Sequence, residues 1–361
     1  MSNPPVIFLI GPTATGKTAV AAALFDRLNA INRGAELVSV DATQVYRGMD
    51  IGSAKPSADF LRRYPHHLID IRAPVDTYNA AAFRADAHEL IQSIRARGKL
   101  PLLVGGSSFY FAALEHGLSK LPAADAGARA DINRAIEQRG TAAMHEQLQR
   151  IDAAAAAAIR PSDAQRISRA LEIHRLTGCA PSAVMRRAAP KSLAFPLIKF
   201  GIFTADRRQL HARIDARFQQ MLDCGLLDEV RALAEEFGDA KPPPALRAVG
   251  YRQALNHLRG NLTLDAMRAK GIAATRQLAK RQLTWMRQQR NLLWVDVSAG
   301  DAAGELAVDG MCAYLQQRFD AADDCDRDGD SDCDSDSDSD SDSDGDSIDN
   351  HSRGDNNRAT N

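Results

Sequence analysis

The feature that most constrains this chain is the stretch GPTATGKT, residues 11–18, near its start. It fits the Walker A pattern, in which two glycines separated by four residues are followed by Lys and Thr. An apolar run (residues 6–10) precedes it and a helix-like run (residues 19–28) follows. The sequence therefore predicts a strand, a phosphate-binding loop and a helix in that order, but the motif leaves open what the phosphate is attached to.

The loop offers three kinds of group to a phosphate. Its glycines let backbone N–H groups turn inward, and the helix N-terminus favours negative charge. Lys17 adds a point charge, and the hydroxyl of Thr18 is a candidate ligand of Mg²⁺. The candidate diphosphate- or nucleotide-binding residues are Gly11, Pro12, Thr13, Ala14, Thr15, Gly16, Lys17 and Thr18.

Short β-like runs recur along the chain at residues 6–10, 37–40, 100–104, 199–203 and 292–297. Helical patterns separate them, and residues 79–97 show apolar residues at helical spacing before Gly98. This order predicts an α/β fold, a parallel sheet like that of P-loop NTPases with helices on its faces. Residues 121–198 contain no clear strand and are rich in helical patterns.

We therefore expect four segments: the first part of the α/β core (1–120), a helical insertion (121–198), a second, largely helical part of the core (199–320) and a disordered Ser/Asp-rich tail (321–361).

The formal net charge of −1 conceals two regions of opposite sign. Residues 321–361 carry 15 Asp against 3 Arg, whereas the first 320 residues carry 42 basic and 31 acidic side chains. A basic body indicates a polyanionic partner, with RNA or DNA the leading candidates. The tail either competes with RNA for the basic surface or only increases solubility, and we expect no catalytic residue within it.

The sequence also indicates where the protein works. No apolar run approaches the roughly 18 residues of a membrane span, and no secretory leader is present. Five scattered cysteines are typical of free thiols in a reducing compartment. We expect a cytoplasmic protein with no membrane partner, acting as a monomer.

One predicted helix, residues 264–290, is strongly basic. It carries seven Lys or Arg residues against one acid, Asp265, which favours a face turned towards a polyanion. Trp285 lies on the same helix, where core packing is a more common role than base stacking. A second candidate is Asp41, which ends an apolar strand in "ELVSVD". In a kinase or ATPase such an Asp would hold Mg²⁺. The polar cluster after it and the position at a strand end instead favour an Asp41 that faces the loop across a crevice.

Eight ordered blocks over residues 8–290 carry a more specific resemblance. The chain resembles the tRNA dimethylallyltransferase (tRNA isopentenyltransferase) family in its bacterial form, through GPTATGKT, SVDATQVYRGMDIGSAKP, HHLID, LLVGGSSFYF, QRISRALEI, RIDARFQQML, RAVGYRQAL and TRQLAKRQLTWMR. The resemblance implies transfer of a dimethylallyl group from dimethylallyl diphosphate to N6 of adenosine 37, just 3′ of the tRNA anticodon. The loop would then hold a diphosphate that leaves.

The resemblance also implies roles for single residues. Lys17 and Arg217 are expected to hold the diphosphate, Thr18 to bind Mg²⁺, and Asp41 to take the proton from N6. The helical insertion is expected to bind tRNA. The residues implied in the tRNA path are Asp41, Ala42, Thr43, Gln44, Ser107, Gln165, Arg166, Ile167, Ser168, Arg169, Arg247, Ala248, Val249, Gly250, Tyr251, Arg252, Lys280, Arg281, Gln282, Leu283, Thr284, Trp285, Met286 and Arg287.

Three other functions fit parts of the pattern. They are an adenylate isopentenyltransferase, which would use free AMP or ATP, a small-molecule P-loop kinase, and a non-enzymatic RNA-binding switch. The long insertion and the basic helix favour a macromolecular acceptor over the first two.

Overall fold

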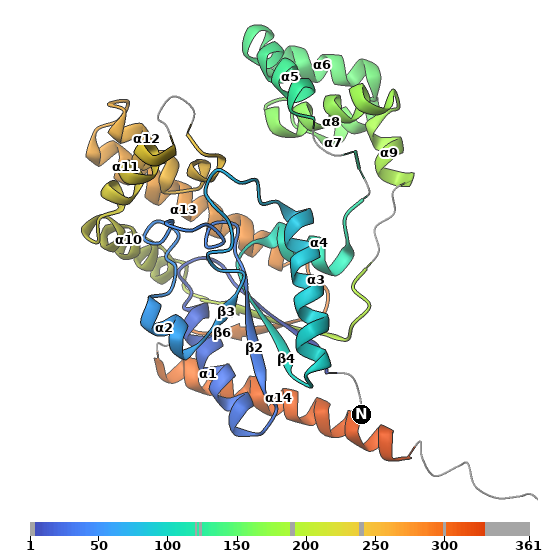
Figure 1. The fold of residues 1–361 in the computed structure, drawn as a ribbon, viewed down its shortest axis with the longest axis vertical. Helices are drawn as coiled ribbons and strands as arrows, with labels where there is room; N and C mark the ends of the chain where they lie inside the picture. Colours follow the sequence, from blue (N-terminus) through green and yellow to red (C-terminus); the bar gives the residue numbers. More distant parts are fainter. Residues whose placement is uncertain are drawn as a thin grey trace, which may run out of the picture. The chain divides into compact units, whose positions relative to one another are not determined.

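The computed structural model describes residues 4–119, 121–122, 125–187, 192–237, 242–298 and 301–328. Its centre is a six-stranded parallel sheet in the order β3-β2-β4-β1-β5-β6 (Figure 1). The strands are β1 (Val6–Ile10), β2 (Ala35–Val40), β3 (His66–His67), β4 (Leu100–Gly105), β5 (Leu197–Phe203) and β6 (Leu292–Asp296). The α/β prediction is confirmed, with all five predicted strands within a few residues of their expected positions.

The sixth strand, β3, was not predicted. It is two residues long and pairs with Leu37 and Val38 at the edge of the sheet. Two half-buried histidines carry no alternation of apolar and polar residues, so the sequence holds no local signal for this strand.

Helices surround the sheet and fill the long connections between strands. They are α1 (Lys17–Ala30), α2 (Ala58–Arg63), α3 (Ala80–Ala96), α4 (Ser108–His116), α5 (Ala126–Arg139), α6 (Thr141–Ile151), α7 (Ala153–Ala158), α8 (Ala164–Thr177), α9 (Pro181–Arg187), α10 (Arg207–Asp223), α11 (Leu226–Phe237), the 3₁₀ turn η1 (Pro244–Arg247), α12 (Tyr251–Leu258), α13 (Leu264–Met286) and α14 (Asp301–Asp328).

Neighbouring residues in the sequence determine where helix α3 begins and ends. Asn79 precedes it, and its side-chain oxygen accepts hydrogen bonds from the N–H groups of Ala81 (2.9 Å) and Ala82 (3.1 Å). Gly98 follows with φ of 70°, a conformation that favours glycine. The helix predicted over residues 79–97 is thereby confirmed.

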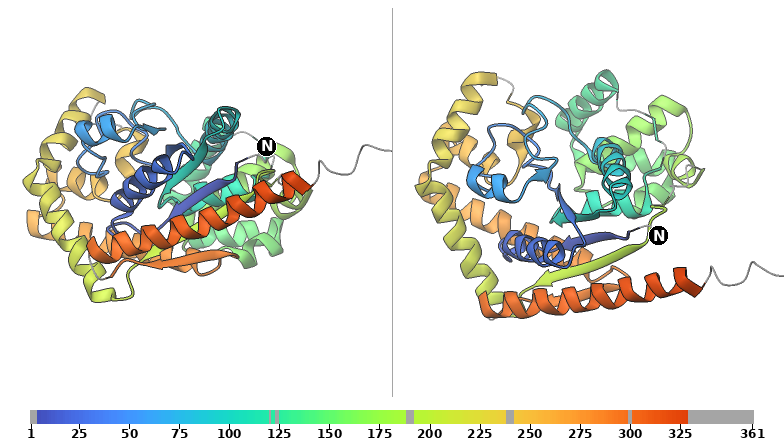
Figure 2. Two further views of the ribbon diagram at one scale, coloured as in Figure 1. Left: turned by 90° about the horizontal axis from the view of Figure 1, so that it is seen from below. Right: turned by 60° about the horizontal axis from the view of Figure 1, so that its bottom comes forward.

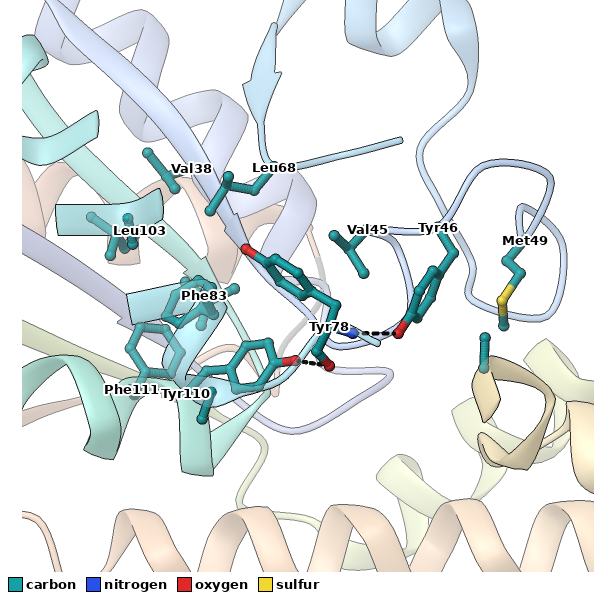
Figure 3. Packing of buried hydrophobic residues seen from close by; sticks show 14 of the residues in the cluster. Val38, Val45, Tyr46, Met49, Leu68, Tyr78, Phe83, Leu103, Tyr110 and Phe111 are labelled. Carbon is teal, nitrogen blue, oxygen red and sulfur yellow. Dashed lines mark hydrogen bonds between the residues drawn. The ribbon is translucent and has the colours of Figure 1, made fainter. Parts of the chain in front are cut away.

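The main core lies where α3 and α4 cover the sheet. Phe8 of β1 packs against Phe111 of α4, with ring centroids 4.9 Å apart, and Phe83 of α3 stacks on Tyr110 at 4.6 Å. Figure 3 shows how a group of tyrosines joins this core to the loop after β2. The Tyr78 N–H donates to the Tyr46 hydroxyl (3.3 Å), and the Tyr110 hydroxyl donates to the Tyr78 carbonyl (3.4 Å). Aromatic packing therefore fixes a loop that has no regular structure of its own.

Helix α1 emerges directly from the phosphate loop and contacts β1, β2 and β4 (Figure 2). Leu24 and Leu28 on its inner side are fully buried, as are Ile7 and Leu9 of β1. Because both surfaces of the central strands are covered, those strands read as continuous apolar runs, which is typical of parallel sheets.

Residues 126–187 form five successive helices, α5 to α9, seen as the green group in Figure 1. They have a hydrophobic cluster of their own, which contains Ile132, Met144, Leu148, Ile167 and Leu171. A separate cluster of this kind supports treating the segment as a domain, and the four-segment division stays a prediction.

The last helix, α14, runs to Asp328. The helix therefore continues eight residues into the segment that we expected to be disordered, because extending an existing helix costs much less than nucleating one. The rest of the predicted tail, residues 329–361, lies outside the described residues.

Candidate functional site

The carboxyl ends of β1, β4 and β2 meet at a cavity of about 1260 Å³. The phosphate loop follows β1, Ser107 follows β4, and Asp41 follows β2, so neighbouring strands bring three distant parts of the sequence together. Arg217 enters the same cavity from α10. This is the position at which parallel α/β sheets bind their ligands.

The phosphate loop is held by its own side chains. The Thr15 hydroxyl donates to the Pro12 carbonyl (2.8 Å), and the Lys17 ammonium donates to the same carbonyl (2.7 Å). Gly16 precedes α1 with φ of 84°, which a side chain would strain. Gly11 lies against β5, where a β-carbon would come within 2.7 Å of the Ile202 carbonyl oxygen. Glycine is thus required at position 16 by its backbone conformation and at position 11 by its close contact with β5.

Two cations share this end of the cavity. Burial and, to a smaller extent, the nearby Arg217 together lower the pKa of Lys17 to about 7, although Asp41 opposes both. Burial also lowers the pKa of Arg217, again opposed by Asp41. Two desolvated cations without a bound anion are unfavourable, so the pair is suited to a ligand that carries several negative charges.

Asp41 has one oxygen engaged and one available. Its Oδ1 accepts hydrogen bonds from the Thr43 N–H (2.8 Å), the Thr43 hydroxyl (2.5 Å) and the Gln44 N–H (3.3 Å). Among the described residues no hydrogen bond engages Oδ2. The turn is held further by the Ala42 N–H, which donates to Ser107 Oγ (3.1 Å). The carboxylate is thus fixed through one oxygen, and the other can accept a proton or a hydrogen bond.

Gln282 connects the loop to the neighbouring strand. Its Oε1 accepts from the Thr13 N–H (3.0 Å), and its Nε2 donates to the Gly106 carbonyl (2.7 Å). A β-carbon on Gly106 would come within 2.4 Å of that nitrogen, so only glycine leaves room for the bridge. Gln282 lines the cavity, but both polar atoms of its amide form hydrogen bonds with the protein backbone.

Many of the predicted site residues line this one cavity. From the loop and the catalytic candidates they are Thr13, Ala14, Lys17, Thr18, Asp41 and Arg217. From the implied tRNA path they are Ala42, Thr43, Gln44, Ser107, Arg166, Arg247, Ala248, Val249, Gly250, Arg281, Gln282 and Trp285. Trp285 also packs near Phe111, with centroids 6.5 Å apart, so it belongs to the core and to the cavity wall together.

Other residues of the implied tRNA path point away from the cavity. Ile167, Ser168, Tyr251 and Met286 are buried, and Ile167 is part of the core of α5–α8. The resemblance assigned continuous stretches of residues to the tRNA path, whereas a helix presents only one side to a ligand. Their burial argues against direct contact of these four with RNA, and their place in the tRNA path stays a prediction. Arg169 is likewise engaged in the protein, through Glu172 (2.8 Å) and the Pro122 carbonyl (2.8 Å).

The basic helix α13 also has two sides. Arg281 and Trp285 face the main cavity, whereas Lys280, Leu283, Thr284 and Arg287 line a second cavity of about 400 Å³. Arg207 and His211 of α10 complete the basic lining of that cavity. The positive residues are thus spread around the helix and do not gather on the one face that the charge count favoured, and contact with a polyanion stays a prediction.

Phe109 was missed by sequence reasoning. It lines the main cavity at the start of α4, and 67% of its surface is exposed. The sequence held no clear signal for it, since a single apolar residue after a strand end is as often buried as exposed, and a single exposed apolar residue is common on protein surfaces. Tyr78 lines the same cavity and was also not singled out, whereas Tyr46, which lines it too, belongs to the polar cluster noted after Asp41.

The oxygen groups near the loop fit Mg²⁺ better than a tightly caged metal. Thr18 contributes a hydroxyl to the cavity lining, and Asp41 a carboxylate. Within the described residues there is no group of three or more His, Cys, Asp or Glu side chains that could hold a metal ion. Mg²⁺ is commonly bound through one or two protein oxygens together with substrate phosphates, and this donor set suits that arrangement.

Comparisons with known proteins agree with this geometry. The sequence model of the family described as IPP transferase matches residues 44–289. A tRNA dimethylallyltransferase of Methylobacillus flagellatus is 48% identical over 318 residues, 87% of this chain and 99% of the relative. One from Aromatoleum aromaticum is 53% identical over 291 residues, 80% of this chain and 89% of the relative.

A solved structure extends the similarity to the fold. The full-length tRNA isopentenylpyrophosphate transferase of Bacillus halodurans is 34% identical and covers 88% of this chain and 99% of its own, with a TM-score of 0.63. Because the family model matches more than half of the chain and relatives about 50% identical cover most of it, the chain belongs to the IPP transferase family.

Proposed function

We propose that this chain transfers a dimethylallyl group from dimethylallyl diphosphate to N6 of the adenosine just 3′ of the tRNA anticodon, position 37. The C1–O bond to diphosphate breaks, the bond from N6 to C1 forms, and the proton lost from N6 goes to the protein. The observation that carries this proposal is that Asp41, Lys17 and Arg217 line one cavity. A proton acceptor and a pair of diphosphate-binding cations are the two things that the reaction needs.

Lys17 and Arg217 act on the leaving group. Negative charge grows on the diphosphate oxygen as the C1–O bond breaks, so these half-buried cations stabilise the transition state more than the bound substrate. Backbone N–H groups of the loop and the start of α1 add to the same effect. Thr18 is the residue that would hold Mg²⁺, and bound Mg²⁺ would neutralise further charge on the diphosphate.

Asp41 acts on the nucleophile. An exocyclic adenine amine is a weak nucleophile, because its lone pair is delocalised into the ring. Asp41 Oδ2 would orient the amine and accept its proton while Oδ1 stays fixed by Thr43 and Gln44. An adenine in a loop is extruded at lower cost than one in a duplex, which suits an anticodon-loop target.

The size and lining of the cavity support a macromolecular acceptor. The exposed ring of Phe109, the partly exposed ring of Trp285 and the arginines Arg166 and Arg247 line it together. Aromatic surfaces bind unstacked bases and arginines bind phosphates, which is the usual combination in single-stranded RNA recognition.

We also propose a cellular location and an oligomeric state. No helix in the described part of the chain is long and apolar enough to cross a membrane. We propose a cytoplasmic enzyme that acts as a monomer.

One assay tests the proposed function against the alternatives. The protein is incubated with dimethylallyl diphosphate, Mg²⁺ and unmodified tRNA, and the tRNA is digested and its adenosines examined by mass. Prenylated adenosine supports the proposal. Parallel reactions with free AMP or with γ-labelled ATP test the adenylate isopentenyltransferase and the kinase. Product in either of these reactions, with none on tRNA, would overturn the proposal.

A further inference from the structure

One wall of the main cavity is an irregular segment, residues 44–56, between β2 and α2. Gln44, Tyr46 and Gly52–Ala54 of this segment line the cavity. Gln44 crosses the segment, with its Nε2 donating to the Ala54 carbonyl (3.3 Å) and its Oε1 accepting from Ser39 Oγ (3.3 Å). The position of this wall therefore depends on side-chain contacts and not on a helix or a strand.

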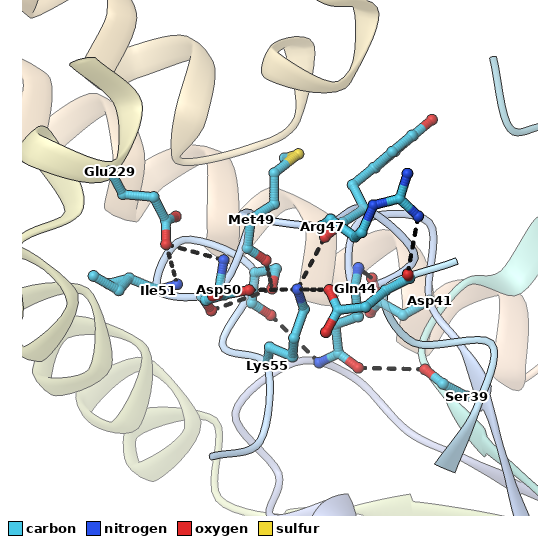
Figure 4. A network of polar contacts seen from close by, with 12 residues as sticks. Ser39, Asp41, Gln44, Arg47, Met49, Asp50, Ile51, Lys55 and Glu229 are labelled. Carbon is cyan, nitrogen blue, oxygen red and sulfur yellow. Dashed lines mark hydrogen bonds and ion pairs between the residues drawn. The ribbon is translucent and has the colours of Figure 1, made fainter. Parts of the chain in front are cut away.

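Glu229 of α11 holds the segment from outside the cavity, as Figure 4 shows. Its Oε2 accepts from the backbone N–H groups of Asp50 (2.9 Å) and Ile51 (2.6 Å). Its Oε1 accepts from the Gly52 N–H (3.1 Å) and from the hydroxyl of Tyr251 (2.6 Å). One carboxylate thus accepts four hydrogen bonds, and bonds to a charged acceptor are the strong ones.

Lys55 links separate parts of the same segment to one another. Its side chain is only 4% exposed, and its ammonium donates to the Tyr46 carbonyl (2.9 Å) and forms ion pairs with Asp50 and Asp70. Figure 4 shows these contacts beside those of Glu229. These contacts tie the segment to itself, so holding it at three backbone N–H groups fixes the position of the wall that it forms.

Tyr251, the side-chain partner of Glu229, connects it to a second wall of the cavity. Tyr251 is fully buried and begins α12, directly after the cavity-lining residues Arg247–Gly250. The two walls touch closely, since a β-carbon on Gly52 would lie 2.6 Å from the Tyr251 ring. Glu229 and Tyr251 therefore join two cavity walls that are about 200 residues apart in the sequence.

We propose that Glu229 and Tyr251 are positioning residues for the tRNA substrate, because they fix the spacing between these two walls. The inference rests on the proposed function for the nature of the ligand. Neither residue contacts the phosphate loop, which Gln282 fixes separately through Thr13 and Gly106. We call the hydrogen bonds that Glu229 accepts from residues 50–52 and from Tyr251 the Glu229 brace. Loss of this brace should therefore weaken tRNA binding and leave diphosphate binding intact.

The test compares Glu229→Ala, Glu229→Gln and Tyr251→Phe with Glu235→Ala, an exposed acid on the same helix. For each variant the melting temperature, the KM and dissociation constant for tRNA, and those for dimethylallyl diphosphate are measured. Glu229→Ala should raise the tRNA KM by about tenfold or more, because four charge-assisted hydrogen bonds are lost together. The diphosphate constants should stay within about twofold of wild type, and Glu235→Ala should match wild type.

Glu229→Gln should partly rescue tRNA binding, since its amide oxygen can still accept two of the four bonds. Tyr251→Phe should raise the tRNA KM by about threefold, the scale of one lost hydrogen bond. If Glu229→Ala does not fold, these two variants decide.

A purely structural role predicts a lower melting temperature with the tRNA and diphosphate constants changed equally or not at all, and either result in the folded variants overturns the proposal. Binding constants keep this test independent of the proposed reaction. Wild-type protein that binds tRNA but forms no product would contradict the reaction and leave the brace to be judged by binding alone.

Discussion

The two ends of the main cavity are built in different ways. At the phosphate end, residues 11–18 form one continuous loop whose backbone and side chains hold one another, with Arg217 and Gln282 as distant additions. At the acceptor end, residues 41–44, 107 and 247–250 come from separate parts of the chain and are tied by side chains such as Ser107 and Glu229. A diphosphate is a small, constant ligand that a local motif can match, whereas a splayed RNA loop needs several distant surfaces. The two ends should therefore fail separately when mutated.

The largest effect is expected at the junction of the two ends, from Asp41→Asn. The amide keeps the shape of the carboxylate but cannot take the proton, so the single-turnover rate should fall by about 10²–10⁴. Binding of tRNA and of diphosphate should each stay within about threefold, since Oδ1 can still accept from the turn. Single-turnover rates with pre-bound substrates check this, and a variant with the wild-type rate would remove Asp41 from the mechanism.

At the phosphate end, Arg217→Ala should weaken dimethylallyl diphosphate binding and slow transfer by about 10²–10³ in kcat/KM. The cation meets charge that increases in the transition state, so the rate should suffer along with the affinity. Affinity for tRNA alone should not change. A variant that loses only tRNA affinity would instead make Arg217 an RNA contact.

Lys17 gives the phosphate end a pH dependence. Burial lowers its pKa to about 7 in the free protein, and a bound diphosphate must raise it. Above pH 7 the free lysine is increasingly neutral while the complex keeps its proton, so binding takes up a proton. The affinity should fall by up to about tenfold per pH unit between pH 7.5 and 9.5.

Calorimetry in two buffers of different ionisation heat measures the proton uptake directly, and Lys17→Met serves as the control that lacks it. Equal affinity across this pH range in the wild type would show that Lys17 is not the group whose protonation accompanies binding.

The smallest effect is expected at the acceptor end, from Phe109→Ala. If an RNA base covers this exposed ring, the tRNA KM should rise by about fivefold, the lower range for loss of one stacked base. Phe109→Tyr should retain the wild-type KM and Phe109→Leu should not, because leucine keeps apolar bulk without a π-face. Fluorescence of 2-aminopurine in the anticodon loop reports stacking, and identical quenching by wild type and Phe109→Ala would rule that contact out.

The same contrast explains what could be predicted from the sequence. The loop, the five longer strands and α3 follow from local patterns, and all of them were predicted. Asp41 could be found because a strand end is visible in the sequence. The Gln282 bridge and the Glu229 brace could not, since an amide or a carboxylate in a polar helix looks the same whether it meets water or a backbone N–H group. The buried side of α8 shows the converse limit, since a resemblance carries a run of residues but not the direction in which each one points.

The most direct test of the account is a structure of the enzyme with an anticodon stem-loop and an unreactive analogue of dimethylallyl diphosphate, with sulfur in place of the bridging oxygen. We expect the diphosphate to lie on residues 13–18 in contact with Lys17 and Arg217, and adenine N6 to lie within hydrogen-bond distance of Asp41 Oδ2. An extruded adenine bound elsewhere, or a diphosphate that Lys17 and Arg217 do not touch, would contradict it.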